Sequence, residues 1–96
     1  MELKKMQENS PKAVTLLKAM ANERRLIILC HLLGGEISVG VLSEKLGLSQ
    51  SALSQHLAWL RRDELVSTRK EAQTVYYSLK SVEVKEMISM LYQLYC

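Results

Sequence analysis

A very short turn between two helical patterns constrains the fold of this chain more than any other feature. Residues 38–46 and residues 49–62 both place apolar side chains at helical spacing, and the junction is the tripeptide Gly47-Leu48-Ser49. The apolar face of the second pattern carries Leu53, Leu57 and Leu60. Two helices joined by a tight turn that contains glycine are typical of a helix-turn-helix.

Three further helical segments are predicted around this motif. Apolar spacing favours helix on both sides of Pro11, which either kinks one long first helix or separates two pieces, with Ser10-Pro11 as a helix-start signal. Residues 23–33 follow Asn22, a good capping residue, and are apolar almost all round, as in a central helix. A last helix is predicted from Ser81 to Cys96.

The segment before the last helix changes its period. Residues 65–70 and residues 74–79 are rich in β-branched and aromatic side chains, which predicts two strands joined by a loop at 71–73. The predicted order is therefore four helices, two strands and a final helix. This is a mainly α (α+β) fold, a winged helix-turn-helix with an extra helix at each end.

Length and composition narrow the classes of protein. A chain of 96 residues with 48% hydrophobic residues predicts a single domain over residues 1–96 and argues against whole-chain disorder. The net charge of +3 and the pI near 9.0 permit a polyanionic partner without requiring one. No apolar run reaches the roughly 18 residues of a membrane span, and the N-terminus lacks a signal-peptide core. We therefore expect a cytoplasmic protein.

The polar face of residues 49–62 points to DNA. Its N-terminal end carries uncharged donors and acceptors suited to base edges, and cations follow at the helix end and on the hairpin. The predicted DNA-binding residues are Ser49, Gln50, Ser51, Ser54, Gln55, Arg61, Arg62, Arg69 and Lys70. Alternatively, the polar face is merely solvated and the arginines stabilise a helix C-terminus. The tight turn, the uncharged face and the basic hairpin together favour double-stranded DNA.

At this level of detail the chain resembles the ArsR/SmtB family of bacterial repressors. The stretches that carry the resemblance are Asn22–Cys30, Ser38–Leu42, Leu48–Leu57, Leu60–Asp63 and Gln73–Leu79. The resemblance implies a nucleoid-associated transcriptional regulator. Its finer details match a branch that includes a haemolysin-expression regulator and sulfide-responsive repressors, which implies control of virulence genes. Where the family usually has a glycine, this chain has Glu64, which would cost on the order of 1 kcal/mol in a left-handed conformation.

The metal sites of that family are not matched here. The Cys-Val-Cys stretch of the arsenic and cadmium sensors is replaced by Ser38-Val39-Gly40, and the last helix lacks the histidines of the zinc sensors. His31 and His56 lie on different predicted helices without a partner ligand nearby in sequence. We therefore predict no regulatory metal and no cofactor.

The two cysteines have two interpretations. The resemblance to the sulfide-responsive branch implies that Cys30 and Cys96, one on each of two helices, form a redox switch. Alternatively, Cys30 is a small core residue and Cys96 an incidental terminal one. A direct disulfide requires Cα atoms within about 7 Å, a limit that a polysulfide bridge relaxes.

The first and last helices carry apolar side chains with no other place to pack, which predicts a homodimer. The predicted interface residues are Met6, Val14, Leu17, Met87, Met90, Leu91, Leu94 and Tyr95. A two-fold dimer would present two recognition helices about 34 Å apart, so we expect an inverted-repeat operator, AT-rich in composition. A thiol enzyme is disfavoured because there is no Cys-x-x-Cys pair. A protein adaptor that uses the helix-turn-helix for protein contacts is the other alternative.

Overall fold

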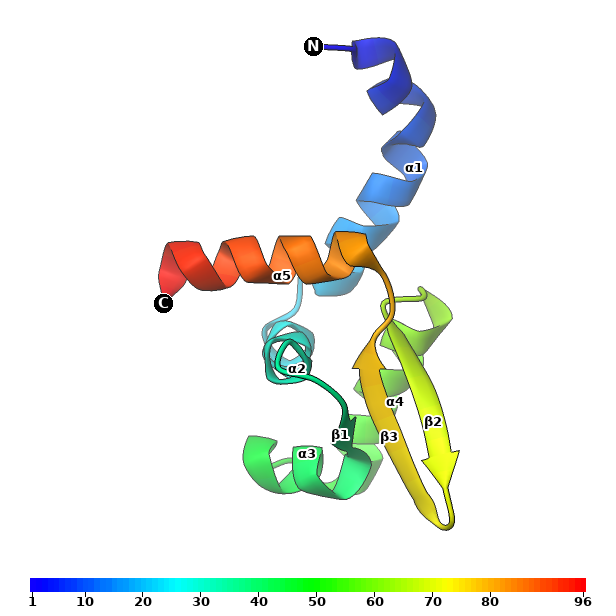
Figure 1. Cartoon of the computed structure of the whole chain (residues 1–96), viewed down its shortest axis with the longest axis vertical. Helices are drawn as coiled ribbons and strands as arrows, with labels where there is room; N and C mark the ends of the chain where they lie inside the picture. The colour runs from blue at the N-terminus through cyan, green and yellow to red at the C-terminus, as the bar shows by residue number, and fades with distance from the viewer.

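The computed structural model describes all residues from 1 to 96 as five helices and a three-stranded antiparallel sheet (Figure 1). In chain order these are α1 (Leu3–Met20), α2 (Glu23–Leu32), β1 (Ile37–Ser38), α3 (Val39–Leu46), α4 (Gln50–Arg62), β2 (Val66–Glu71), β3 (Thr74–Leu79) and α5 (Val82–Tyr95). The predicted winged helix-turn-helix is confirmed, with one further strand. No helix combines the length and the apolar character needed to cross a lipid bilayer.

Four short polar side chains set where helices begin. The side-chain oxygens of Asn22, Ser38, Ser49 and Ser81 each accept a hydrogen bond from a backbone N–H in the first turn of the following helix. Each bond satisfies one of the amides that an α-helix leaves without a partner at its start. The sequence pattern therefore predicts these four boundaries correctly.

The first helix is continuous through Pro11, which confirms the alternative of one long helix, and Ser10-Pro11 does not start a helix. Proline lacks the N–H that would bond to the carbonyl of Gln7. The hydroxyl of Ser10 donates to that carbonyl instead, at 3.0 Å. In Figure 1, α1 bends along its N-terminal half, as expected around an internal proline. The residue that caps the helix is Glu2, whose side chain accepts from the N–H of Lys4.

The turn of the helix-turn-helix is held by its glycine and a serine. Gly47 has φ 65°, a left-handed conformation that glycine adopts without a Cβ penalty. The hydroxyl of Ser43 donates to the carbonyl of Leu48 at 2.5 Å, and the N–H of Leu48 donates back to the carbonyl of Ser43 at 3.3 Å. These bonds fix the angle at which α4 leaves α3.

The sheet has the order β1-β3-β2. The sequence analysis did not predict β1, because two residues are too few to show a period. Ile37 pairs with Tyr77, and Ser38 pairs with Tyr76. The hairpin connection is shorter than predicted: Glu71 pairs with Thr74, and Ala72 at the turn has φ 54°. The sheet joins the start of α3 to the wing formed by β2 and β3 (Figure 1).

The core is small and entirely apolar. It is centred on α2 and α4, and buried residues include Ile28, Leu29, Leu53, Leu57 and Ile88. Only 14 of 96 residues are buried, and most of the large apolar side chains that remain exposed lie on α1 and α5. A single protomer therefore exposes a large apolar surface on α1 and α5 to water.

The corner between α4 and the wing carries the residue that departs from the family pattern. Glu64 has φ 63°, so the expected left-handed conformation is confirmed. The N–H of Glu64 bonds to the carbonyl of Arg61, and the N–H of Leu65 bonds to that of Leu60, which is a Schellman motif. Buried Leu60 and Leu65 accompany it.

Glu64→Gly is expected to raise the free energy of unfolding by about 1 kcal/mol, because glycine removes the Cβ penalty at this corner. The ion pair of Glu64 with Lys80, at 3.2 Å, is exposed and contributes little. Denaturant unfolding at one fixed protein concentration measures the difference. Glu64→Ala loses the same ion pair but keeps the strained φ, so it should show no gain. Equal stability of Glu64→Gly and Glu64→Ala would contradict the explanation.

Candidate nucleic-acid interface

The N-terminal half of α4 presents an uncharged polar surface. Five predicted residues, Ser49, Gln50, Ser51, Ser54 and Gln55, are all exposed. Ser49 also caps the helix, because its hydroxyl oxygen accepts from the N–H of Ala52 at 3.2 Å. The opposite face of α4 is anchored by buried leucines, so the polar face is rigidly presented to solvent.

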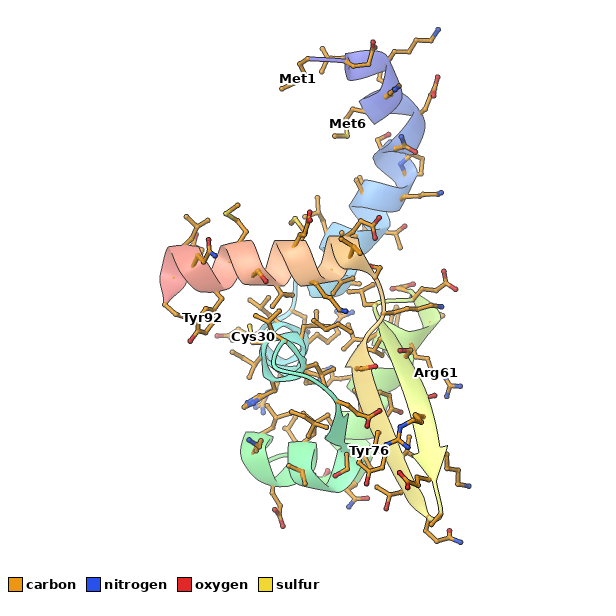
Figure 2. The ribbon with its side chains drawn as sticks, viewed as in Figure 1. Met1, Met6, Cys30, Arg61, Tyr76 and Tyr92 are labelled. Atoms are coloured by element: carbon orange, nitrogen blue, oxygen red, sulfur yellow. The ribbon has the colours of Figure 1, made fainter.

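A shallow depression runs between α4 and the wing. It has a volume of about 470 Å³ and is lined by Ser54, Ala58, Arg61, Arg62 and Tyr77. We call it the recognition groove. Sequence reasoning missed Ala58 and Tyr77, although Ala58 lies four residues after Ser54 and therefore shares its helix face. Figure 2 shows Arg61 projecting outward from this side of the molecule.

Arg62 is less free than Arg61. Its guanidinium lies over the ring of Trp59 at 3.8 Å from the centroid, and its Nε lies 3.4 Å from Oδ1 of Asp63. Stacking on an aromatic ring restrains an arginine side chain without consuming all of its N–H donors. The cationic end of α4 is therefore partly ordered before any ligand binds.

On the wing, the two predicted cations differ in their surroundings. Arg69 makes two bonds to Glu36, at 2.9 and 2.8 Å, and one to Glu71 at 2.7 Å, and it lies over the ring of Tyr76. The hydrogen bond from Arg69 holds the pKa of Glu36 below its ordinary value. Lys70 is exposed and forms no ion pair. Of the two, Lys70 is the cation whose charge no carboxylate of the chain neutralises.

Glu36→Gln is expected to raise affinity for duplex DNA about threefold, because it removes a negative charge and releases part of the Arg69 guanidinium toward phosphate. The low pKa of Glu36 means that its charge is fully present at neutral pH and is lost only as the pH falls through that lowered value. Fluorescence anisotropy with labelled duplex measures the change. Glu44→Gln on α3, an exposed carboxylate outside this cluster, is the control. Weaker binding of Glu36→Gln would instead show that the pair positions the wing.

The two cysteines lie on, or directly after, two helices that contact each other, α2 and α5. Cys30 is half-buried on α2, whereas Cys96 is exposed just after α5, and both are free thiols. Burial raises the pKa of the Cys30 thiol, and the neighbouring Cys96 raises it further. Figure 2 shows Cys30 on α2 beneath α5, on the side where Tyr92 points down. No three His, Cys, Asp or Glu side chains are grouped so that they could hold a metal ion.

The predicted dimer residues divide into two sets. Exposed side chains are Met6, Val14, Leu17, Met90, Leu94 and Tyr95, whereas Met87 and Leu91 partly pack against the protomer's own core. Sequence reasoning missed Leu3, Val82 and Tyr92, each of which is more than half exposed. All these residues lie on α1 and α5, the two helices that extend away from the wing in Figure 1.

A winged helix-turn-helix whose second helix presents an exposed polar face beside a cationic end belongs to a class of DNA-binding proteins. The chain belongs to the ArsR family of bacterial regulatory proteins, whose family model matches residues 22–68. It is a DNA-binding transcriptional regulator of that family.

Individual relatives support this assignment over the whole chain. The chain is 72% identical to the transcriptional activator HlyU of Vibrio cholerae, and the match covers 100% of this chain and 89% of that protein. A solved structure of that HlyU has a TM-score of 0.92 at 74% identity, covering 95% of this chain and 99% of that one. The repressor BigR from Xylella fastidiosa gives 0.92 at 32% identity, covering 100% and 98%.

A Mycobacterium bovis winged helix-turn-helix domain, described as homodimeric and as a possible ArsR-family regulator, is also similar. Its TM-score is 0.80 at 26% identity, over 98% of this chain and 85% of that one.

Proposed function

We propose that the chain binds an AT-rich inverted-repeat operator as a homodimer. The N-terminal half of α4 reads bases in the major groove, and Arg61, Arg62, Arg69 and Lys70 contact the flanking backbone or the minor groove. The apolar surface left on α1 and α5 supports a dimer, and the related M. bovis domain is described as homodimeric. Two-fold symmetry of the protein implies two-fold symmetry of the operator.

The observation that carries this proposal is the exposed, uncharged face of α4. Glutamine amides pair with adenine edges, and serine hydroxyls pair with any base, so these side chains suit sequence discrimination rather than general attraction to phosphate. The buried leucines beneath them fix the helix, and the recognition groove beside them is lined by Arg61 and Arg62. A protein adaptor would have no need for cations placed beside such a face.

Mobility shifts with fragments of the source genome, followed by Gln50→Ala, test this proposal. The variant is expected to lose about tenfold in affinity for the selected operator while its affinity for unrelated duplex stays the same, because a base contact adds specificity and a phosphate contact does not. Gln93→Ala on α5, also exposed, is the control and should match the native chain. A protein adaptor would show no preference for any fragment, and Gln50→Ala would change nothing.

We further propose that Cys30 and Cys96 form a redox switch in this regulator. Joining the two sulfurs releases two protons and two electrons, which a peroxide or a sulfane-sulfur compound accepts. The bond would fasten the end of α5 to α2. Because α5 also carries the proposed dimer surface, the bond would change the spacing of the two recognition helices. Contacts between α2 and α5, and the free state of both thiols, support this link.

We propose that this regulator acts at the nucleoid and that its target genes are haemolysin or other toxin genes. This proposal agrees with the 72% identity to the activator HlyU. Chromatin immunoprecipitation in the source organism would identify the bound promoters. Enrichment of promoters without toxin genes would overturn this assignment while leaving operator binding intact.

A further inference from the structure

A second depression opens between α1, α2 and the C-terminal turn of α4. It has a volume of about 280 Å³ and is lined by Thr15, Lys18, Ala19, Arg25, Trp59, Arg62 and Asp63. Three of these side chains are cations and one is a carboxylate, so the depression is positively charged. We call it the cationic cleft. The helix-turn-helix and wing residues assigned above do not include Lys18, Arg25 or Trp59.

An exposed aromatic ring organises the cations of this cleft. Trp59 is the only tryptophan of the chain and is 51% exposed. The guanidinium carbon of Arg62 lies 3.8 Å from the ring centroid, and that of Arg25 lies 5.7 Å away. Stacked guanidinium groups keep their N–H edges free for a bidentate acceptor, and their order before binding lowers the entropy lost on binding.

We infer that the cationic cleft binds the phosphodiester backbone beside the groove that α4 reads. This inference rests on the proposed operator binding. Arg62 lines both the recognition groove and the cationic cleft, so the two depressions border the same side chain at the end of α4. The 13 residues of α4 span about 20 Å, whereas the major groove is about 12 Å wide.

The C-terminal turn of α4 therefore leaves the groove and meets the backbone that borders it. There, Lys18 and Arg25 add two cations from helices outside the helix-turn-helix. A carboxylate-rich peptide would also suit these side chains. Duplex DNA is favoured because Arg62 connects the cleft to a face already assigned to DNA.

Arg25→Ala tests the inference through the salt dependence of operator binding. Loss of one phosphate contact is expected to weaken binding about tenfold and to reduce the slope of log Kd against log salt by about 0.9 for each protomer. Arg24→Ala is the matched control, since Arg24 is an exposed arginine on the same helix that does not line the cleft. Arg25→Lys keeps the positive charge but loses the forked N–H donors of the guanidinium. It should therefore keep the native slope of log Kd against log salt and bind operator more weakly.

The single tryptophan supplies an independent measurement on the native chain. Iodide, an anion, should quench the fluorescence of Trp59. Operator DNA should reduce this quenching in proportion to the fraction of protein that is bound to it. Polyglutamate serves as the probe for a peptide ligand. Protection by polyglutamate but not by DNA would overturn the inference and make the cleft a protein-docking site.

The two proposals fail in different ways. If native protein binds operator but Arg25→Ala and Arg24→Ala have the native affinity and slope, the cationic cleft is not a backbone site. If native protein binds no duplex at all, the operator proposal itself fails. Thermal unfolding of Arg25→Ala shows whether this variant is folded. If it is not folded, the operator affinity and salt slope of Arg25→Lys test the cationic cleft instead.

Discussion

Replacement of both Leu17 and Leu94 by glutamate is expected to yield a folded monomer that binds operator at least about a hundredfold more weakly than the native chain. In the protomer these side chains are 51% and 66% exposed, so a charge there costs little folding free energy. In a dimer through α1 and α5 the same charges would be buried without partners, which strongly opposes association. Because the two-fold axis relates the two protomers, the two substitutions would place four glutamates in the interface.

The loss of DNA affinity follows from the geometry of two half-sites. When one protomer of a dimer is bound, its partner meets the second half-site at an effective concentration far above that of free protein, which raises the affinity by a factor of about 10²–10⁴. A monomer loses this gain although every base contact of its own α4 is intact. Its affinity for a single half-site should therefore equal that of the native protomer.

Sedimentation and mobility shifts on full and half operators measure these two quantities. Ile27→Glu on α2 is a suitable control, because Ile27 is 47% exposed but lies outside the proposed interface. It should remain dimeric and bind normally. A double variant that stays dimeric, or a monomer with native affinity for the full operator, would contradict the dimer model.

The parts of the fold that the sequence predicts well are those decided locally. Asn22, Ser38, Ser49 and Ser81 cap helices within three residues of themselves, and Gly47 sets its own backbone conformation. At Pro11 local rules left two alternatives open, and the helix continues because a hydroxyl one residue earlier satisfies the carbonyl that proline leaves free. The general lesson is that a breaker residue ends a helix only when nothing nearby replaces its lost bond.

The parts of the site that the sequence does not predict depend on contacts between distant segments. Arg69 and Glu36 are 33 residues apart, and only the pairing of β1 with β3 brings the loop before α3 to the wing. Trp59 looks like an ordinary position on a helix until α1 and α2 supply the rest of the cationic cleft. A pattern of residue types therefore identifies the recognition helix, whereas the charge available on the wing is a property of the folded chain.

Oxidation of the reduced protein by a peroxide or a sulfane-sulfur compound is expected to weaken operator binding about a hundredfold, near the upper end of ordinary coupling between two sites. The effect requires that the bond between Cys30 and Cys96 be more stable in the conformation that does not fit the operator. Mobility shifts before and after oxidation, with restoration by a thiol reductant, measure it. Cys30→Ser and Cys96→Ser should each bind like reduced native protein under both conditions.

The pH dependence of this reaction follows from the surroundings of Cys30. Burial, and secondly Cys96, raise the pKa of the Cys30 thiol, so its thiolate is scarce at neutral pH and the reaction accelerates as the pH rises through that raised pKa. The thiol ionises more readily in the unfolded chain, so the stability it contributes is complete below the ordinary cysteine pKa and is lost between that pKa and the raised one.

Cys96→Ser separates the two causes of the shift. Without the second thiolate the pKa of Cys30 should fall but stay above its ordinary value, because burial is the larger cause. The rate of iodoacetamide alkylation against pH gives that value directly, with Cys30→Ser measured alongside to correct for Cys96 in the native chain. An unchanged pKa would mean that the two sulfurs do not approach one another in solution. The switch would then lack its structural basis, while DNA recognition through α4 would be unaffected.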